Sequence, residues 1–194
     1  MNDKTFLTFL LLYTLLSCSK ALPSPQPNPS IINNFAILSE ILRLDALKEN
    51  ITVIDVDMLQ TLLTSDDYAS DEMNQIQTMV KYHEYEHVGH SLGILGVYIS
   101  SGKHLSCPGH ALSHYYIFMK HEEADLANDA LIEAKTTFPI WLPKTRDAER
   151  NTSSAQEFDT AASQMQTYFD NIEAGNTTFP SDEGLKRLSD APCI

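Results

Sequence analysis

Apolar residues recur along most of this chain at spacings of three and four, which is the period of an α-helix. Polar residues fall between them, and glycines are few for 194 residues. The pattern predicts six helices, which cover about residues 30–48, 55–63, 70–99, 108–136, 153–175 and 182–188. We therefore expect an all-α fold, an antiparallel helical bundle in a single domain over residues 30–194.

Proline and glycine place several of the helix ends. Pro108 suits the first turn of a helix, and Pro139 and Pro143 predict that this helix ends near Thr136. Gly175 suits the end of the fifth helix.

The N-terminal segment has the pattern of an export signal. Lys4 precedes an apolar run over residues 6–16, and small residues up to Ala21 allow cleavage before Leu22. The run is too short for a membrane span. We therefore predict a signal peptide over residues 1–21, a proline-rich leader over 22–29 and a secreted chain with no transmembrane segment. Alternatively, residues 15–18 form a bacterial lipoprotein motif, in which Cys18 carries the lipid.

Two cysteines remain outside the signal segment, Cys107 and Cys193. An oxidising compartment favours a disulfide between them, with a free thiol or a metal ligand at Cys107 as the alternative. Glycosylation sequons, which matter only in a eukaryotic host, begin at Asn50, Asn151 and Asn176. The net charge of −13 argues against binding to nucleic acid. The sequence names no protein partner.

All seven histidines lie between positions 83 and 121. Two helical stripes contain most of them: residues 76, 80, 83, 87 and 94 in the third helix, and residues 110, 114, 118, 121 and 125 in the fourth. The connection over 100–107 is short, so the two helices should pack antiparallel with their stripes facing one another. Imidazole is a common ligand of transition metals. The pattern therefore predicts a metal ion as a partner, with candidate ligands His83, Glu84, His87, His114, His121 and Glu122.

Residues 83–87 read His-Glu-Tyr-Glu-His. This segment resembles the H-E-x-x-H motif of zinc metalloproteases, in which one helical turn supplies two zinc ligands and a glutamate base. The resemblance implies that His83 and His87 bind zinc and that Glu84 is the catalytic base. The third ligand would come from His121, Glu122 or Glu123.

Residues 55–66 read Asp-Val-Asp-Met-Leu-Gln-Thr-Leu-Leu-Thr-Ser-Asp, and Val88 follows the histidine motif. Together these segments, within positions 51–97, resemble the secreted desiccation- and stress-related proteins, a ferritin-like family. The resemblance implies a ferritin-like bundle with iron or manganese held by Glu84 and His87, and Asp66 stands where that family has a glutamate. Glu122, Glu123 and Asp125 are the downstream acidic residues that complete such a site.

Three functions remain open from the sequence. The first is an exported metal-binding protein of ferritin-like type, with its metal held by the third and fourth helices. The second is a small secreted zinc hydrolase. The third is a cell-surface or interaction protein whose histidines are structural, or change charge near pH 6.

Overall fold

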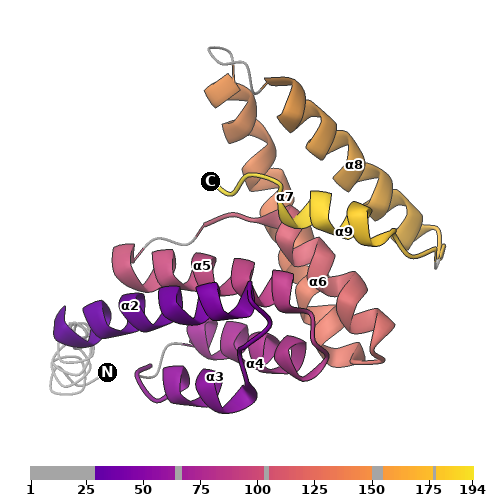
Figure 1. The fold of residues 1–194 in the computed structure, drawn as a ribbon. Helices are drawn as coiled ribbons and strands as arrows, with labels where there is room; N and C mark the ends of the chain where they lie inside the picture. Colours follow the sequence, from indigo (N-terminus) through magenta and orange to yellow (C-terminus); the bar gives the residue numbers. More distant parts are fainter. Residues whose placement is uncertain (1–28, 64–66, 103–104, 150–154, 177) are drawn as a thin grey trace, which may run out of the picture.

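The computed structural model describes residues 29–63, 67–102, 105–149, 155–176 and 178–194. These residues contain helices and no strands, which confirms the all-α class (Figure 1). The helices are α2 (Pro29–Ala46), α3 (Val53–Gln60), α4 (Asp67–Lys81), α5 (Tyr85–Ser101), α6 (Pro108–Lys120), α7 (Ala124–Glu149), α8 (Ala155–Glu173) and α9 (Asp182–Ser189). The predicted signal segment, Cys18 and Asn151 lie outside the described residues. None of the described helices is long and apolar enough to cross a membrane.

The helices pack in two groups, as Figure 1 shows. In the first group, α2 packs on α5, and α3 and α4 complete it. In the second group, α6 packs on α7 and on α9, and α8 contacts α7 and α9. The seam between the groups lies where α4 and α5 meet α6, and it holds the polar residues discussed below.

Two of the predicted long helices are broken, so the prediction of continuous helices over 70–99 and 108–136 is wrong. In the first of these segments, α4 ends at Lys81 and α5 begins at Tyr85. In the second, α6 ends at Lys120 and α7 begins at Ala124. Each break contains a residue in the left-handed region, His83 (φ 61°) and Glu122 (φ 62°). Because the next amide donates back to the carbonyl five residues earlier, both breaks are Schellman ends that stop the helix.

The prediction that a helix ends near Thr136 is also wrong, because α7 continues through Pro139 and Pro143 to Glu149. Packing explains the continuation. Trp141 is fully buried, and the ring of Phe138 lies 5.3 Å from that of Phe169 in α8. Burying two aromatic side chains stabilises this segment by several kcal/mol, which offsets much of the cost of about 3 kcal/mol for each of the two prolines.

A disulfide and several hydrogen bonds connect the C-terminal segment to the start of α6 and to α7. Cys107 and Cys193 form a disulfide, as predicted. The indole of Trp141 donates to the carbonyl of Pro192 at 2.6 Å, and Ser106 and Ile194 exchange backbone hydrogen bonds. Gly109 lets α9 approach closely, since a Cβ there would lie 2.4 Å from the carbonyl oxygen of Leu188. These contacts hold α9 against the face of α6 that carries the histidines.

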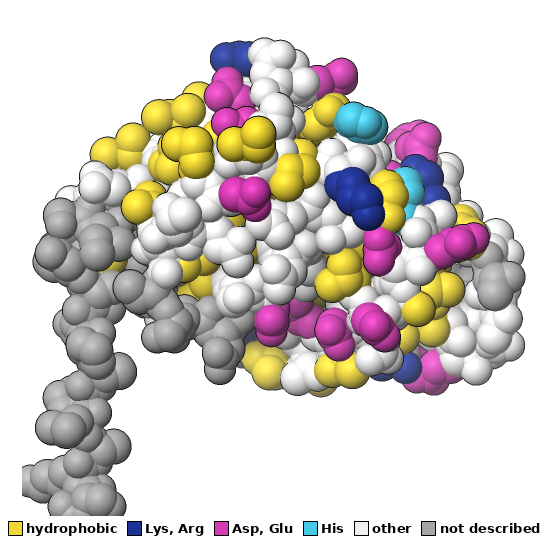
Figure 2. All heavy atoms as spheres, turned by 90° about the horizontal axis from the view of Figure 1, so that it is seen from below, with side chains coloured by type: hydrophobic (Ala, Val, Ile, Leu, Met, Phe, Trp, Pro, Cys, Tyr) yellow, Lys and Arg dark blue, Asp and Glu magenta, His cyan; other side chains and the backbone are white. Residues whose placement is uncertain are grey.

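The surface combines exposed apolar and acidic side chains. Figure 2 shows hydrophobic side chains grouped on the face seen from below, with acidic residues near them. The apolar residues most exposed on α2 and α3 are Ile37, Ile54 and Met58. Asn50 and Asn176 are also exposed, so both acceptor side chains are accessible, and their glycosylation remains a prediction.

Candidate metal centre

Four polar side chains are buried at the seam between the two helical groups: Glu72 of α4, Ser91 of α5, and His110 and His114 of α6. Helix α6 is buried from Pro108 to Phe118 with few exceptions, so its two histidines, one turn apart, point inward. Glu72 lies on the buried face of α4, which continues through Gln75, Ile76 and Met79.

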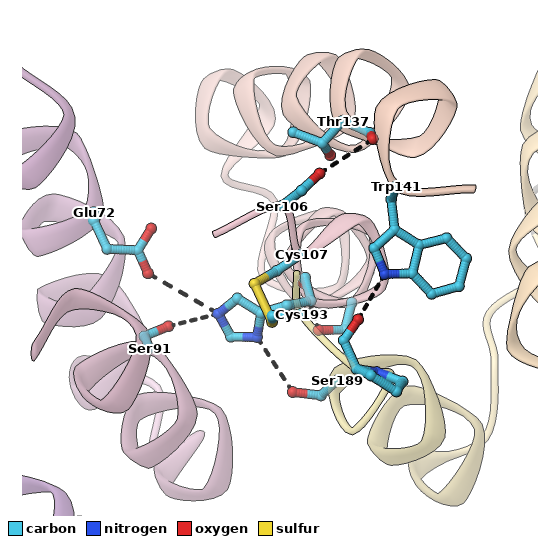
Figure 3. The surroundings of a disulfide bond; sticks show 11 residues. Glu72, Ser91, Ser106, Cys107, Thr137, Trp141, Ser189 and Cys193 are labelled. Carbon is cyan, nitrogen blue, oxygen red and sulfur yellow. Dashed lines mark hydrogen bonds and ion pairs between the residues drawn. A yellow bond between two sulfur atoms is a disulfide. The ribbon is translucent and has the colours of Figure 1, made fainter. Parts of the chain in front are cut away.

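Glu72, His110 and His114 have the geometry of a metal site. One carboxylate oxygen and one nitrogen from each imidazole all lie within 4.8 Å of one another, and all three side chains are buried. The distance from Glu72 Oε1 to His110 Nε2 is 4.0 Å. Figure 3 shows Glu72 and Ser91 directed at the same imidazole nitrogen, with Ser189 at the other nitrogen of that ring. Three protein ligands with room for others are typical of reactive metal sites.

Hydrogen bonds orient both imidazoles. His114 Nδ1 lies 2.8 Å from Gln75 Oε1, which can only accept, so Nδ1 carries the proton and Nε2 offers a lone pair. The hydroxyl of Ser91 lies 3.0 Å from His110 Nε2 and 3.2 Å from His114 Nε2. His110 Nδ1 lies 3.3 Å from Ser189 Oγ of α9. Such outer contacts are the ones that fix ligand histidines in metal proteins.

The centre is uncharged at neutral pH without a metal. Burial raises the pKa of Glu72 to about 8, with help from the nearby Glu133 carboxylate and against a hydrogen bond from Ser91. Burial, together with the neighbouring His87 and His90, lowers the pKa of His114 to about 3. Burial also holds the pKa of His110 well below its ordinary value. A protonated carboxyl and two neutral imidazoles therefore share the seam.

One polar atom of this network lacks a hydrogen-bond partner in the described part of the chain. Glu72 Oε1 is buried and has no hydrogen-bond partner among the described residues. His87 Nδ1 is the other such atom, and burial lowers the pKa of His87. An unsatisfied buried polar atom costs about 1–3 kcal/mol, so an ion or a water that reached the Glu72 oxygen would be stabilised there.

The predicted ligands are divided between this centre and other places. His114 belongs to the centre, and His87 is buried near it, close enough to lower the pKa of both its histidines. His83 is exposed and hydrogen-bonds to the Tyr85 hydroxyl at 2.6 Å. Glu122 is exposed, and Asp66 lies outside the described residues.

Glu84 and His121 form a separate contact beside the two helix breaks. The His121 imidazole donates to Glu84 Oε1 at 2.9 Å, and Lys120 donates to the same oxygen at 3.0 Å. Burial raises the pKa of Glu84, but these hydrogen bonds and the Lys120 charge outweigh it, and the pKa is lowered. The ring of Tyr82 stacks on His121 at 4.1 Å. This contact joins the two breaks.

The helical geometry that the H-E-x-x-H resemblance requires is absent. His83 lies in the left-handed link and Glu84 is the N-cap of α5, so only His87 of the three stands within the helix. His83 and His87 therefore do not lie one turn apart on a continuous helix. The expectation that one helical turn presents both histidines and a base is wrong.

The sequence-based interpretation missed Glu72, and it placed His110 in the facing stripe without including it among the ligands. The signal for Glu72 was a carboxylate in the apolar stripe that continues through Ile76 and Val80. No family model matches this chain, and no curated protein or solved structure matches it at a significant level. The function must therefore be argued from the geometry of the centre.

Proposed function

We propose that this chain is an exported metal-binding protein, in which Glu72, His110 and His114 hold one divalent transition metal ion. The observation that supports this most is the unsatisfied Glu72 oxygen beside two inward imidazoles, all within 4.8 Å. A metal ion would satisfy that oxygen and both Nε2 atoms together.

The three donor groups narrow the choice of metal ion. Two imidazoles and one carboxylate form the ligand set of many non-haem iron sites, and zinc enzymes use the same set. We take iron or manganese as the resident metal, with zinc as the alternative. One three-ligand group implies one ion per chain, whereas a ferritin-like pair of ions would require further carboxylates at the centre.

Export is part of the proposal. The disulfide suggests an oxidising compartment, and the sequence pattern of residues 1–21 predicts a signal peptide. A secreted protein must retain its metal at low free concentrations. The proposed site is buried and is lined by two neutral imidazoles and one acid. Such a site suits retention of the ion, because few waters compete for it.

A structural role for the histidines is the competing function, and one observation favours it. If His110 Nε2 carries a proton, it donates to Ser91, and the Ser91 hydroxyl donates to His114 Nε2. Both imidazoles are then satisfied without a metal, and a protonated Glu72 remains beside them. Metal analysis separates the two functions.

The experiment is elemental analysis of untagged protein purified without added metal. We expect about one transition metal ion per chain. His114→Gln and Glu72→Gln should lose it, whereas the exposed control His83→Gln should keep it. Absence of metal from the parent protein, even after incubation with iron, manganese and zinc, would contradict the proposal and support the structural role. About two ions per chain would support the ferritin-like resemblance.

A further inference from the structure

A cavity of about 710 Å³ lies between α4 and α7, beside the candidate metal centre. Glu72 and Gln75, which contact the two histidines, form part of its α4 wall. Leu105, Ser106 and Ile194 also line the cavity. This volume is within the range of small-molecule sites in proteins, roughly 300–1,000 Å³.

The charges around the cavity are mainly negative. Asp71, Asp129 and Glu133 line it together with Glu72, and Lys144 is the one cationic residue among the described lining residues. Among the described residues, no lysine or arginine forms an ion pair with any of these four carboxyl groups. Glu133 is half-buried, and burial raises its pKa, so a bound cation would stabilise its ionised form.

The cavity also has an apolar half. Ile132 and Ile140 of α7 line it and are exposed, by 56% and 50%. Along α7 the acidic residues come first and Ile140 follows seven residues after Glu133, a distance of about 10 Å along a helix. Glu72 lines the opposite wall, but its oxygen without a partner among the described residues belongs to the metal centre, so the cation in the cavity is left to the α7 carboxylates. An ammonium group would meet the carboxylates at one end of the cavity, and an alkyl chain would run from Ile132, which lies between them, to Ile140 at the other end.

We propose that this cavity binds a small amphiphilic amine, with its ammonium group at Glu133 and Asp129 and its alkyl chain along Ile132 and Ile140. The inference goes beyond metal binding, because the cation is held by carboxylates that are not among the proposed metal ligands. It places an organic ligand next to the metal centre, separated from His114 by Gln75 and from His110 by Glu72.

Calorimetric titration of the full mature chain with n-octylamine tests this proposal, with n-octanoate as a probe of the same length and opposite charge. Octylamine should bind and octanoate should not. Glu133→Gln should weaken octylamine binding at least about tenfold, because a charged pair next to apolar surface is lost. The matched control is Glu173→Gln, since Glu173 is exposed on α8 and pairs with Lys135.

Each outcome bears on one proposal. Octylamine affinity that is equal in the parent and in Glu133→Gln, or equal for octanoate, would overturn the inference, as would no binding of octylamine. Asp129→Asn, at an exposed position, serves if Glu133→Gln fails to fold, as judged by circular dichroism. Metal content is measured on the same samples. Amine binding without metal would contradict only the proposed function, and metal without amine binding would contradict only this inference.

Discussion

Glu72 determines how the metal centre responds to its surroundings. Its carboxyl group is protonated at neutral pH because burial and Glu133 raise its pKa to about 8. A metal ion must therefore displace one proton from Glu72, while His110 and His114 are already neutral. When no metal is present, burying the Glu72 carboxyl group therefore costs free energy of folding at neutral pH, whereas burying the two imidazoles costs little.

Replacing Glu72 by glutamine should remove the metal and stabilise the metal-free protein at alkaline pH. The pKa of Glu72 is raised on folding from 4.5 to about 8. Its contribution to stability is therefore complete below pH 4.5 and is lost as the pH rises through about 8. Thermal unfolding of EDTA-treated protein should show Glu72→Gln melting above the parent at pH of about 9. Glu173→Gln should follow the parent, and a variant that keeps its metal would contradict the ligand assignment.

The two histidines of α6 should make the metal-free protein sensitive to acid. The pKa of His114 falls from 6.5 to about 3 on folding, because burial and the neighbouring His87 and His90 disfavour its charge. The stability that depends on it is present above pH 6.5 and is lost as the pH falls toward 3. The melting temperature should therefore drop as the pH falls from about 7 to about 4, and His114→Gln should flatten this dependence.

The exposed His83 provides the control for that experiment. His83→Gln should keep the full acid dependence of the parent, because His83 is solvent-exposed. If His114→Gln and His83→Gln show the same acid dependence, the buried imidazole is not its source.

At the residue scale, the sequence predicted one ligand of this centre, His114, and the inward position of a second, His110. His110 and His114 recur one turn apart in a stripe with Phe118, so their inward position follows from helical periodicity. Glu72 could not be assigned in the same way. A carboxylate near the start of a helix is usually a solvated residue, and only the crossing of α4 and α6 brings it to the imidazoles.

At the scale of elements, the helix breaks are the feature that periodicity did not predict. The apolar stripes continue across both breaks, and glycine, the usual residue at a left-handed helix end, is absent from them. Gly175 marks such an end and was predicted, whereas His83 and Glu122 adopt the same conformation without that signal. The contact between Glu84 and His121 links the breaks, so tertiary contacts decide where these helices stop.

His83→Gly should stabilise the protein. A residue other than glycine in the left-handed region costs about 1 kcal/mol, and glycine removes most of that cost. We expect the free energy of unfolding to rise by about 0.5–1 kcal/mol in urea titrations, with unchanged metal content. His83→Ala is the matched control and should not stabilise. A loss of metal in His83→Gly would instead make His83 a ligand, as the H-E-x-x-H resemblance implied.

At the scale of the whole molecule, the centre lies between two groups of helices, which also meet where Glu84 contacts His121 and where Glu86 pairs with Lys186. Glu72 and Ser91 come from the first group, and His110, His114 and Ser189 come from the second. A metal ion bound here would link α4 to α6 and stabilise the arrangement of both groups. The periodicity predicted most of the helical segments and the inward position of His110 and His114, but loop lengths alone could not predict which groups of helices form.

The disulfide should support both the fold and the centre. It closes a loop between residues 86 positions apart, and the chain-entropy estimate for such a loop is about 4.5 kcal/mol. It also fastens the end of α9, which carries Ser189 at 3.3 Å from His110 Nδ1. Replacing Cys107 and Cys193 by serine should therefore lower the free energy of unfolding by several kcal/mol in denaturant titrations.

Metal affinity should fall with the disulfide, because Ser189 no longer orients the His110 ring. Loss of an outer contact of this kind weakens metal binding by about 10–100-fold in metal proteins. Ser189→Ala should give the same loss of affinity with the disulfide intact, whereas Lys186→Gln, which removes an exposed ion pair between α9 and Glu86, should leave it unchanged. Metal titration of the three variants distinguishes the roles of the disulfide. If the cysteine variant is destabilised but binds metal as the parent does, the disulfide stabilises the chain without positioning His110.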